Sequence, residues 1–179
     1  MSHRKQSHLL EREHKLQEIG GNMQKLGMFV DKEKLAEHHE AFTALLAKHR
    51  QICAEILSDE FNPASPHQLQ RVLFTDWKLP PVKYNEKTGD PSTDDDTLRR
   101  MLTDYHLDEE RKTLIQAVRM VRRYGKLINN YLRPLATKQV LADGRVHPSY
   151  NRIPTTGRYS SSSPNAQNVP ALLRDIFVP

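Results

Sequence analysis

The segment from Asp108 to Leu132 is the most regular part of the sequence, and it restricts the possible folds more than any other. Its apolar residues recur in steps of three, four and seven, which is the spacing of one face of an α-helix. At about 100° per residue, a set of basic residues lies on a second face, offset by roughly 120° from the apolar one. The segment therefore predicts a helix that packs on one side and holds phosphate groups on another. The apolar set is Leu114, Val118, Val121, Ile128 and Leu132, and the basic set is Arg119, Arg122, Lys126 and Arg133.

The amino-acid composition favours slender amphipathic helices over a compact, fully buried core. Only 37% of the 179 residues are hydrophobic, and the mean hydropathy is -0.72. Helices that expose much of their surface can form with such a low content of hydrophobic residues. We therefore expect a mainly α protein, extended in shape, with a small antiparallel β part.

Positive charge is concentrated in the second half of the chain. The formal net charge is +5, and between Arg111 and Arg174 the sole acidic residue is Asp143. Such a field suits the phosphates of a polyanion. A solvated basic face without a ligand is the competing interpretation.

Two helices are expected before residue 60. Residues from Ser7 to Lys25 show the spacing of a charged helix, and the pair Gly20-Gly21 leaves open whether it is one helix or two helical pieces. Asp31 can cap a second helix, which we expect to run to about Ser58.

A third helix start is marked by Ser65, which is followed by a proline at the first helical position. Gln68 stands where it can complete a capping box with Ser65, so a short helix to about Phe74 is expected. The stretch from Leu79 to Pro91 is rich in Pro, Gly, Asn and Asp and predicts a loop.

Three consecutive aspartates, Asp94 to Asp96, follow Thr93. We expect Thr93 to cap a helix whose first turn carries the aspartates. Carboxylates in the first turn interact favourably with the positive end of the helix dipole. A metal site is the alternative, but consecutive helical residues point in different directions, which favours the capping interpretation.

The character of the chain changes at Pro134, which we expect to end the long helix. From Val140 to Pro179 the sequence contains glycines, prolines and short β-prone pieces. We expect a small antiparallel hairpin here, with Asp143-Gly144 as its turn.

Cysteine and histidine placement argues against disulfide, zinc and nucleophilic chemistry. Cys53 is the only cysteine, so a reducing, cytoplasmic setting is expected. The adjacent pair His38-His39 lacks the helical spacing of paired ligands, and Cys53 has no evident local partner. No apolar run approaches the roughly 18 residues of a membrane span, and no signal-peptide core is present, so we expect no membrane partner.

The run from Thr156 to Pro170 carries the most specific pattern and reads TGRYSSSSPNAQNVP. It resembles the stretch of family A (Pol I type) DNA polymerases that reads TGRLSS, a variable pair, then PNLQNIP. Asp143 to His147 resembles the strand before that stretch, and Phe61 to Leu69 resembles the start of the family's thumb. Weaker likenesses are Lys87-Thr88-Gly89 with Ser92-Thr93 at the thumb tip, and Met23, Gly27 and Asp31 in the helix entering the thumb.

The resemblance implies an elongated helical thumb followed by the first strands of a polymerase palm. It divides the chain into N-terminal helices leading into the thumb (1–60), thumb helices (61–137) and the start of the palm (138–179). Three departures stand out: Tyr159 and Ala166 replace usual leucines, and Arg152 replaces a common glutamine.

The resemblance also implies DNA-binding roles. Arg158 and Gln167 would donate to the purine N3 and pyrimidine O2 acceptors that the minor groove presents at every base pair, which suits a sequence-blind enzyme that also senses mismatches. Lys126 and Arg122 would meet phosphates on the long thumb helix. The remaining expected DNA contacts are Asn165, Asn168, Thr156, Thr88, Ser92 and Thr93.

The family's two metal-binding catalytic aspartates are not found in this chain, so we expect no catalytic or metal-ligating residue here and no polymerisation by the chain alone. The leading hypothesis is one chain of a split polymerase that grips primer-template DNA, while a separate palm and fingers chain supplies Mg²⁺ and catalysis. A stand-alone, non-catalytic DNA-binding module and a truncated polymerase remnant are the alternatives.

Overall fold

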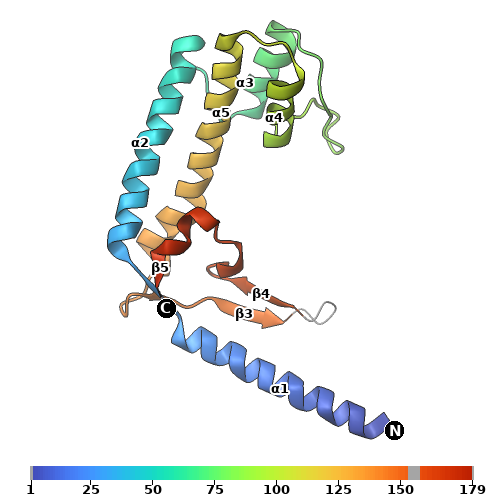
Figure 1. Ribbon diagram of the computed structural model, residues 1–179, viewed down its shortest axis with the longest axis vertical. Coiled ribbons are helices and arrows are strands. Elements are labelled where there is room, and N and C mark those ends of the chain that lie inside the picture. Colours follow the sequence, from blue (N-terminus) through green and yellow to red (C-terminus); the bar gives the residue numbers. More distant parts are fainter. Residues whose placement is uncertain (1, 153–157, 179) are drawn as a thin grey trace. The chain divides into compact units, whose positions relative to one another are not determined.

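The computed structural model describes residues 2–152 and 158–178, and it is mainly helical with small antiparallel sheets (Figure 1), which confirms the predicted fold class. No helix in these ranges is long and apolar enough to span a membrane. The α-helices are α1 (Ser2–Leu26), α2 (Lys32–Ile56), α3 (Pro66–Gln70), α4 (Asp95–Asp104) and α5 (Glu109–Leu127). The strands are β1 (Met28–Val30), β2 (Arg145–Val146), β3 (Ser149–Arg152), β4 (Tyr159–Ser162) and β5 (Phe177–Val178). The shorter helical turns are η1 (Arg71–Asp76), η2 (Ile128–Leu132), η3 (Leu135–Gln139), η4 (Ala166–Asn168) and η5 (Ala171–Ile176).

The backbone forms two compact units. The first unit combines Met1–His39 with Asn130–Pro179, and the second is Glu40–Asn129. Residues from the two ends of the chain therefore fold together in the first unit. The predicted division at residues 60 and 137 concerns polymerase subdomains and stays a prediction.

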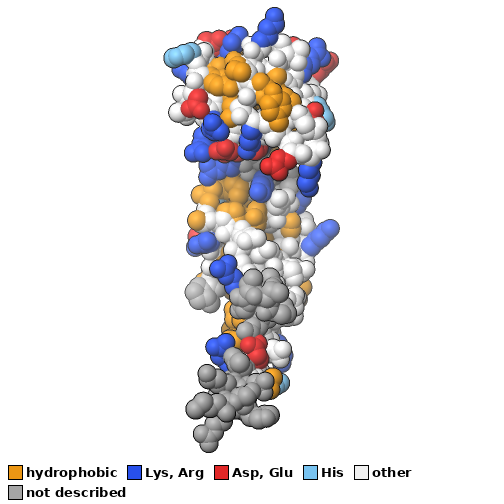
Figure 2. Space-filling model, turned by 90° about the vertical axis from the view of Figure 1, so that its right-hand side faces the viewer, with side chains coloured by type: hydrophobic (Ala, Val, Ile, Leu, Met, Phe, Trp, Pro, Cys, Tyr) orange, Lys and Arg blue, Asp and Glu red, His pale blue; other side chains and the backbone are white. Residues whose placement is uncertain are grey.

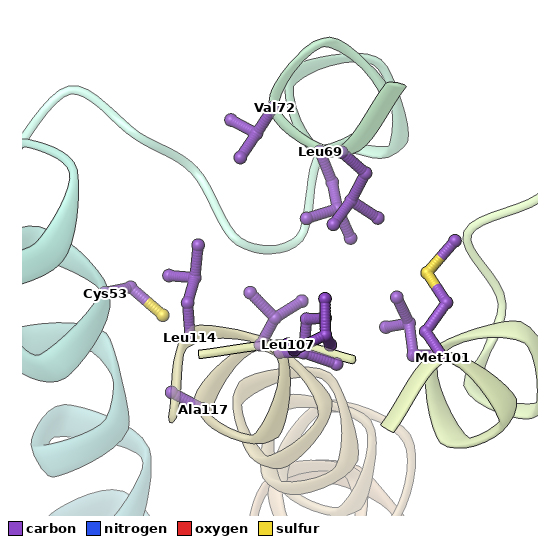
Figure 3. Close-up of a cluster of buried hydrophobic side chains, with 11 residues drawn as sticks. Cys53, Leu69, Val72, Met101, Leu107, Leu114 and Ala117 are labelled. Carbon is purple, nitrogen blue, oxygen red and sulfur yellow. The ribbon is translucent and has the colours of Figure 1, made fainter. Parts of the chain in front are cut away.

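The second unit is built around a cluster of buried apolar side chains (Figure 3). Leu114 and Val118 contribute to it from the predicted apolar face of α5, and all five residues predicted on that face are buried. Cys53 of α2 points toward Leu114, and burial raises the pKa of its thiol to about 11. A thiol that stays protonated at neutral pH packs as a small apolar group, so Cys53 is a packing residue of this cluster.

Side-chain caps begin α2 and α3 where the sequence predicted helix starts. Asp31 Oδ1 accepts from the amides two and three residues further on, at 3.0 and 3.1 Å. Ser65 Oγ accepts from the Gln68 amide at 3.4 Å. The predicted capping box does not close, because the Ser65 amide already donates to the Asn62 carbonyl at 2.9 Å. The Gln68 side chain instead accepts from the Asn62 amide at 2.6 Å.

The cap of α4 is Asp94 and not Thr93, which corrects the prediction by one residue. Asp94 Oδ1 accepts from the Thr97 amide at 2.8 Å. Thr93 is buried, and its carbonyl accepts from Arg122, so it stands one residue ahead of the helix as part of the packed turn. Asp108 caps α5 in the same way as Asp94, by accepting from the amide three residues further on at 2.8 Å.

Helical turns continue through Pro134 to Gln139, so the prediction that this proline ends the long helix was wrong. The turns on both sides of it, η2 and η3, are wide π-helical turns. A proline lacks an amide hydrogen, and its ring collides with the carbonyl four residues earlier in a regular α-helix. Wider turns around it relieve this conflict and let the helical path continue.

The three-stranded sheet of the first unit has the order β2-β1-β5, with both pairs antiparallel. Met28 of β1 lies opposite Val146 of β2, and Phe29 lies opposite Val178 of β5. The central strand therefore comes from the N-terminal part of the chain. Neither edge strand is adjacent to it in sequence.

The turn at Asp143-Gly144 is present, but it does not join a hairpin as predicted. Gly144 has φ +76 and donates to the Leu141 carbonyl at 3.0 Å. The residues before this turn are helical up to Gln139, so no preceding strand is available and β2 pairs with β1 instead. The hairpin proper is formed by β3 and β4, which are paired antiparallel from Ser149 opposite Ser162 onward.

α1 is one continuous helix, so the pair Gly20-Gly21 does not divide it into two pieces. It ends at Gly27, which has φ +65 and donates to the Met23 carbonyl at 3.0 Å. A residue in this left-handed conformation directly after a helix is a common helix end that favours glycine. A Cβ atom at Gly27 would also lie 2.7 Å from the Val146 carbonyl oxygen, so the close approach of β2 requires glycine as well.

The last carbonyls of α1 accept from basic side chains around β2. His147 Nδ1 lies 2.8 Å from the Gln24 carbonyl oxygen, and Arg145 Nη1 donates to the Leu26 carbonyl at 3.4 Å. The other ring nitrogen of His147, Nε2, lies 2.9 Å from Asp143 Oδ2. Both nitrogens face acceptors, so the imidazolium form satisfies both contacts at once. Positive charge at this position also interacts favourably with the negative, C-terminal end of the helix dipole.

This arrangement predicts that the end of α1 is held in a pH-dependent way. The hydrogen bonds to the Gln24 carbonyl and to Asp143 raise the pKa of His147 above its ordinary value of 6.5. Stabilisation by a group with a raised pKa is complete below that ordinary value and is lost as the pH rises through the folded-state pKa. Hydrogen exchange of residues 23–27, corrected for the intrinsic rate, should therefore lose protection as the pH rises above 6.5. Asp143→Asn should move this loss to lower pH, and a flat wild-type profile would contradict the assignment.

Candidate nucleic-acid interface

The cations on the basic face of α5 differ in the intramolecular hydrogen bonds and ion pairs that they make. Arg119 donates from Nε and Nη2 to the two carboxylate oxygens of Asp95, at 2.7 and 3.1 Å. Its side chain is 21% exposed, and its hydrogen bond lowers the pKa of Asp95 below the usual range. Arg119 is therefore held by a bidentate ion pair, and a phosphate would have to compete with Asp95 for it.

Arg122 is half-buried and ties α5 to two other segments of the second unit. Its Nε donates to the Pro63 carbonyl at 3.0 Å, and its Nη1 donates to the Thr93 carbonyl. The remaining nitrogen, Nη2, is buried without a hydrogen-bond partner in the structure. Burial lowers the pKa of this guanidinium from its ordinary value. Arg122 thus positions the turn before α4, and its predicted phosphate contact stays a prediction.

Arg133, the fourth cation predicted on the basic face, is exposed beyond the end of α5. Arg123, which the prediction did not include, and Lys126 are exposed on α5 itself. Both line an open hollow of about 360 Å³, together with the paired Arg119 and the half-buried Arg122. Extended cations beside a concave surface can meet a backbone phosphate without losing an intramolecular partner. The remaining lining residues of this hollow, named here the α5 groove, are Asp95, Leu98 and Met120.

The three hydroxyl residues predicted at the thumb tip surround one hollow of about 250 Å³. Thr88 Oγ1 accepts from the Asp90 amide at 3.4 Å, and Ser92 Oγ accepts from the Asp94 amide at 3.3 Å. Thr93 is buried. The structure therefore brings these residues together, but their hydroxyls have local partners or lie inside, and their contact with DNA stays a prediction.

Each carboxylate of Asp94 to Asp96 pairs with a cation. Figure 2 shows acidic and basic side chains beside one another in the upper part of the face it draws. Partial burial would raise the pKa of Asp94, but hydrogen bonds from Lys83 and the Thr97 amide lower it to about 2. Asp95 pairs with Arg119 and Asp96 with Arg99, at 2.7 Å each. Within the described ranges no three acidic, His or Cys side chains are grouped to hold a metal ion. The aspartates fit the capping and ion-pair interpretation.

In the first unit, Ser161 organises the stretch that carries the expected minor-groove donors. Ser161 is buried, its hydroxyl donates to Asn165 Oδ1 at 3.0 Å, and it accepts from the Gln167 amide at 3.1 Å. These bonds hold the turn η4 against strand β4. Arg158, directly before β4, and Gln167, within η4, are both exposed. Gln167 thus extends from backbone that this hydroxyl fixes in place, and Arg158 extends from the residue directly before the same strand.

Asn165 and Asn168 line a hollow of about 210 Å³ beside this stretch. Tyr131 also lines it and donates from its hydroxyl to the Asn168 carbonyl at 3.1 Å. The structure therefore brings together three of the predicted DNA-binding residues, Asn165, Gln167 and Asn168, and Arg158 lies directly before the strand that η4 contacts. Thr156 lies outside the described residues.

Sequence reasoning missed the structural roles of Ser161 and Tyr131. Ser161 stands in a run of four serines, and nothing in the run distinguishes the buried hydroxyl from its neighbours. The alternation of a strand gives a partial signal, because every second side chain of β4 faces the same way. Which face is buried depends on η4 and could not be read from that run.

The chain is similar to known proteins over most of its length. The family model described as DNA polymerase family A matches residues 32–179. DNA polymerase I of Bacillus caldotenax is 37% identical over 179 residues, covering 96% of this chain and 19% of that protein. DNA polymerase I of Treponema pallidum is 36% identical over 155 residues, covering 85% of this chain and 14% of that protein. The chain thus spans less than a fifth of the length of these relatives.

A solved structure has the same fold. It is described as the POL domain of Pol1 from M. smegmatis in complex with DNA primer-template and dNTP. The TM-score is 0.81 at 29% sequence identity, and the match covers 93% of this chain and 29% of that one. The helical arrangement and small sheets described above are therefore those of part of this polymerase domain.

The buried hydroxyl of Ser161 provides a test of how this stretch is held. Ser161→Ala should destabilise β4 and η4 by about 1–2 kcal/mol, because the Gln167 amide and Asn165 lose a shared partner. Hydrogen exchange of residues 158–168 and urea unfolding would measure the loss. The matched control is Ser162→Ala, an exposed neighbour whose substitution should stay within about 0.5 kcal/mol. Equal effects of the two substitutions would contradict the assigned role.

Proposed function

Because the chain belongs to DNA polymerase family A, we propose that it forms the part of such an enzyme that grips the primer-template duplex. In this proposal the thumb and the first strands of the palm supply the contacts. The observation that carries it is the pair of exposed donors, Gln167 on backbone that is fixed through Ser161, and Arg158 directly before β4. The similar POL domain is described as a complex with primer-template DNA, which supports the same conclusion.

Reading of the duplex would be the task of Arg158 and Gln167. Both can donate to minor-groove acceptors that every base pair presents at similar positions, so their contact does not depend on sequence. A mispaired base at the primer end displaces these acceptors. The same two donors would therefore bind a matched end better than a mismatched one.

Grip would come from the exposed cations of the α5 groove, Lys126 and Arg123. Phosphate contacts of this kind release counterions, so they weaken as the salt concentration rises. Arg122 and Arg119 would act mainly by shaping the groove, since their donors already bind the Thr93 turn and Asp95.

Nucleotidyl transfer would depend on carboxylates supplied by a second chain with the rest of the palm and the fingers. The Asp94 to Asp96 cluster does not fit a two-metal site, because its members pair with different cations. Asp143 contacts His147, and Asp175 contacts His38 at 3.0 Å. Mg²⁺ is therefore assigned in this proposal to the second chain, which would complete the DNA polymerase.

The proposal is tested by equilibrium binding of a fluorescent primer-template hairpin, followed by extension assays. The chain should bind the hairpin with an affinity that falls with salt. It should incorporate no nucleotide alone with Mg²⁺, and it should support extension when a polymerase chain carrying palm and fingers is added. Binding without any effect on such a chain would favour a stand-alone DNA-binding module, and absence of binding would contradict the proposal.

Two substitutions separate phosphate binding (grip) from recognition of the minor groove at the primer end (reading). Lys126→Ala should weaken binding and reduce the slope of log affinity against log salt by about 1, whereas Lys48→Ala, the same charge change on exposed α2, should leave the slope unchanged. Arg158→Ala should impair extension from the primer end more than it impairs overall binding. Equal effects of Lys126→Ala and Arg158→Ala on both measurements would count against these assignments.

A further inference from the structure

α1 lies against the hairpin β3–β4 within the first unit (Figure 1). The backbone of α1 is nearest to β3, and Tyr159, the first residue of the neighbouring β4, also reaches α1. Its hydroxyl donates to the Leu16 carbonyl of α1. Gly20 is buried at this point, and a Cβ atom placed there would lie 3.2 Å from Cε1 of the tyrosine ring. The ring therefore occupies space that any other residue at position 20 would partly fill.

Gly20 also explains how a carbonyl in the middle of a helix can accept from Tyr159. In an α-helix the side chain of a residue leans toward the preceding turn and covers the carbonyl four residues earlier. The carbonyl four residues before Gly20 is that of Leu16. A glycine leaves this oxygen uncovered, so the tyrosine hydroxyl can reach it from the side.

The neighbouring Gly21 provides an internal comparison. A Cβ atom at Gly21 would meet no other atom within 4 Å. Both glycines are in the same turn of α1, and replacing either by alanine brings the same gain in helix propensity. Only position 20 faces Tyr159, so the two positions differ in the contact and in little else.

Tyr159 is directly followed and preceded by residues of the proposed DNA-contacting stretch. Arg158 comes immediately before it, and the buried Ser161 lies two residues after it. Tyr159 begins the strand, and the exposed Arg158 comes directly before it, so the backbone from which Arg158 extends is held where Tyr159 is held. The orientation of the arginine thus depends on the anchoring of the residue next to it.

A second attachment keeps α1 from pivoting about Tyr159. His147 and Arg145 bind the carbonyls of Gln24 and Leu26 at the end of the helix. Leu16 and Gln24 are separated by about 12 Å along the axis at 1.5 Å per residue. α1 is therefore attached to β4 at one point and to β2 and the residue after it at another.

We propose that Gly20 and Tyr159 form a lock between α1 and β4 that positions Arg158, which makes α1 a positioning element of the minor-groove contact. The second half of this inference rests on the proposed function, whereas the lock itself does not. Tyr159 acts through the arginine beside it and does not contact DNA.

Hydrogen exchange tests the lock without DNA. Gly20→Ala should raise the exchange rates of the β4 amides, residues 159–162, by about two- to tenfold, the effect of losing one hydrogen bond and its packing. Tyr159→Phe should give a similar increase, because it removes the hydroxyl that donates to the Leu16 carbonyl and leaves the ring in place. Gly21→Ala, the matched control, should leave the β4 rates unchanged. If Gly20→Ala and Gly21→Ala give the same rates in β4, the lock does not exist.

Binding of matched and mismatched primer ends tests the coupling to Arg158. Tyr159→Phe should reduce the preference for the matched end by about two- to fivefold, and it should have no further effect in an Arg158→Ala background, as expected for residues that act as one unit. Equal effects of Tyr159→Phe in both backgrounds would overturn the positioning role. If the wild-type chain binds no duplex, the proposed function fails, and the exchange rates alone decide whether the lock is real.

Discussion

The free backbone groups at helix ends are the constraint around which this chain is organised, since every helix leaves amides at its start and carbonyls at its end without partners. Asp94 and Asp108 satisfy the starts of α4 and α5, and Asp31 does so for α2. At the end of α1, His147 and Arg145 donate to carbonyls that the helix cannot satisfy itself. These demands commit many polar side chains to the fold, and only the remaining ones are available to a ligand.

The same constraint divides the basic face of α5 into two groups. Arg122 donates to two backbone carbonyls of packed turns, and Arg119 holds a carboxylate of the first turn of α4. Removing either would leave buried or paired groups without partners, so a loss of DNA binding in such variants would not identify a phosphate contact. Among the described residues, no hydrogen bond or ion pair commits the side chains of Lys126 and Arg123 to the packing, so their substitution leaves the fold's own contacts in place. The helical period predicts which face is basic, but not which of its cations are free.

Features set by neighbouring residues were predicted from the sequence, and features set by distant residues were not. Asp31 and Ser65 cap helices through amides within three positions, and the α5 apolar face follows one helical period. The bond from Tyr159 to Leu16 joins residues 143 positions apart, and no local pattern reveals it. Thr93 was mistaken for a cap because both it and Asp94 can accept from an amide, and packing under Arg122 decided between them.

Grip and reading require different things of the protein, and the two parts of the candidate interface meet those requirements differently. A phosphate is charged and can be approached from many directions, so a flexible lysine such as Lys126 suffices. A minor-groove acceptor is neutral and has a fixed position, so a donor that reads it must be held in place before the DNA arrives. Ser161 restrains the backbone at Gln167, and the bond from Tyr159 to the Leu16 carbonyl restrains the residue that follows Arg158. Discrimination at the primer end should therefore be more sensitive than affinity to substitutions that never touch DNA.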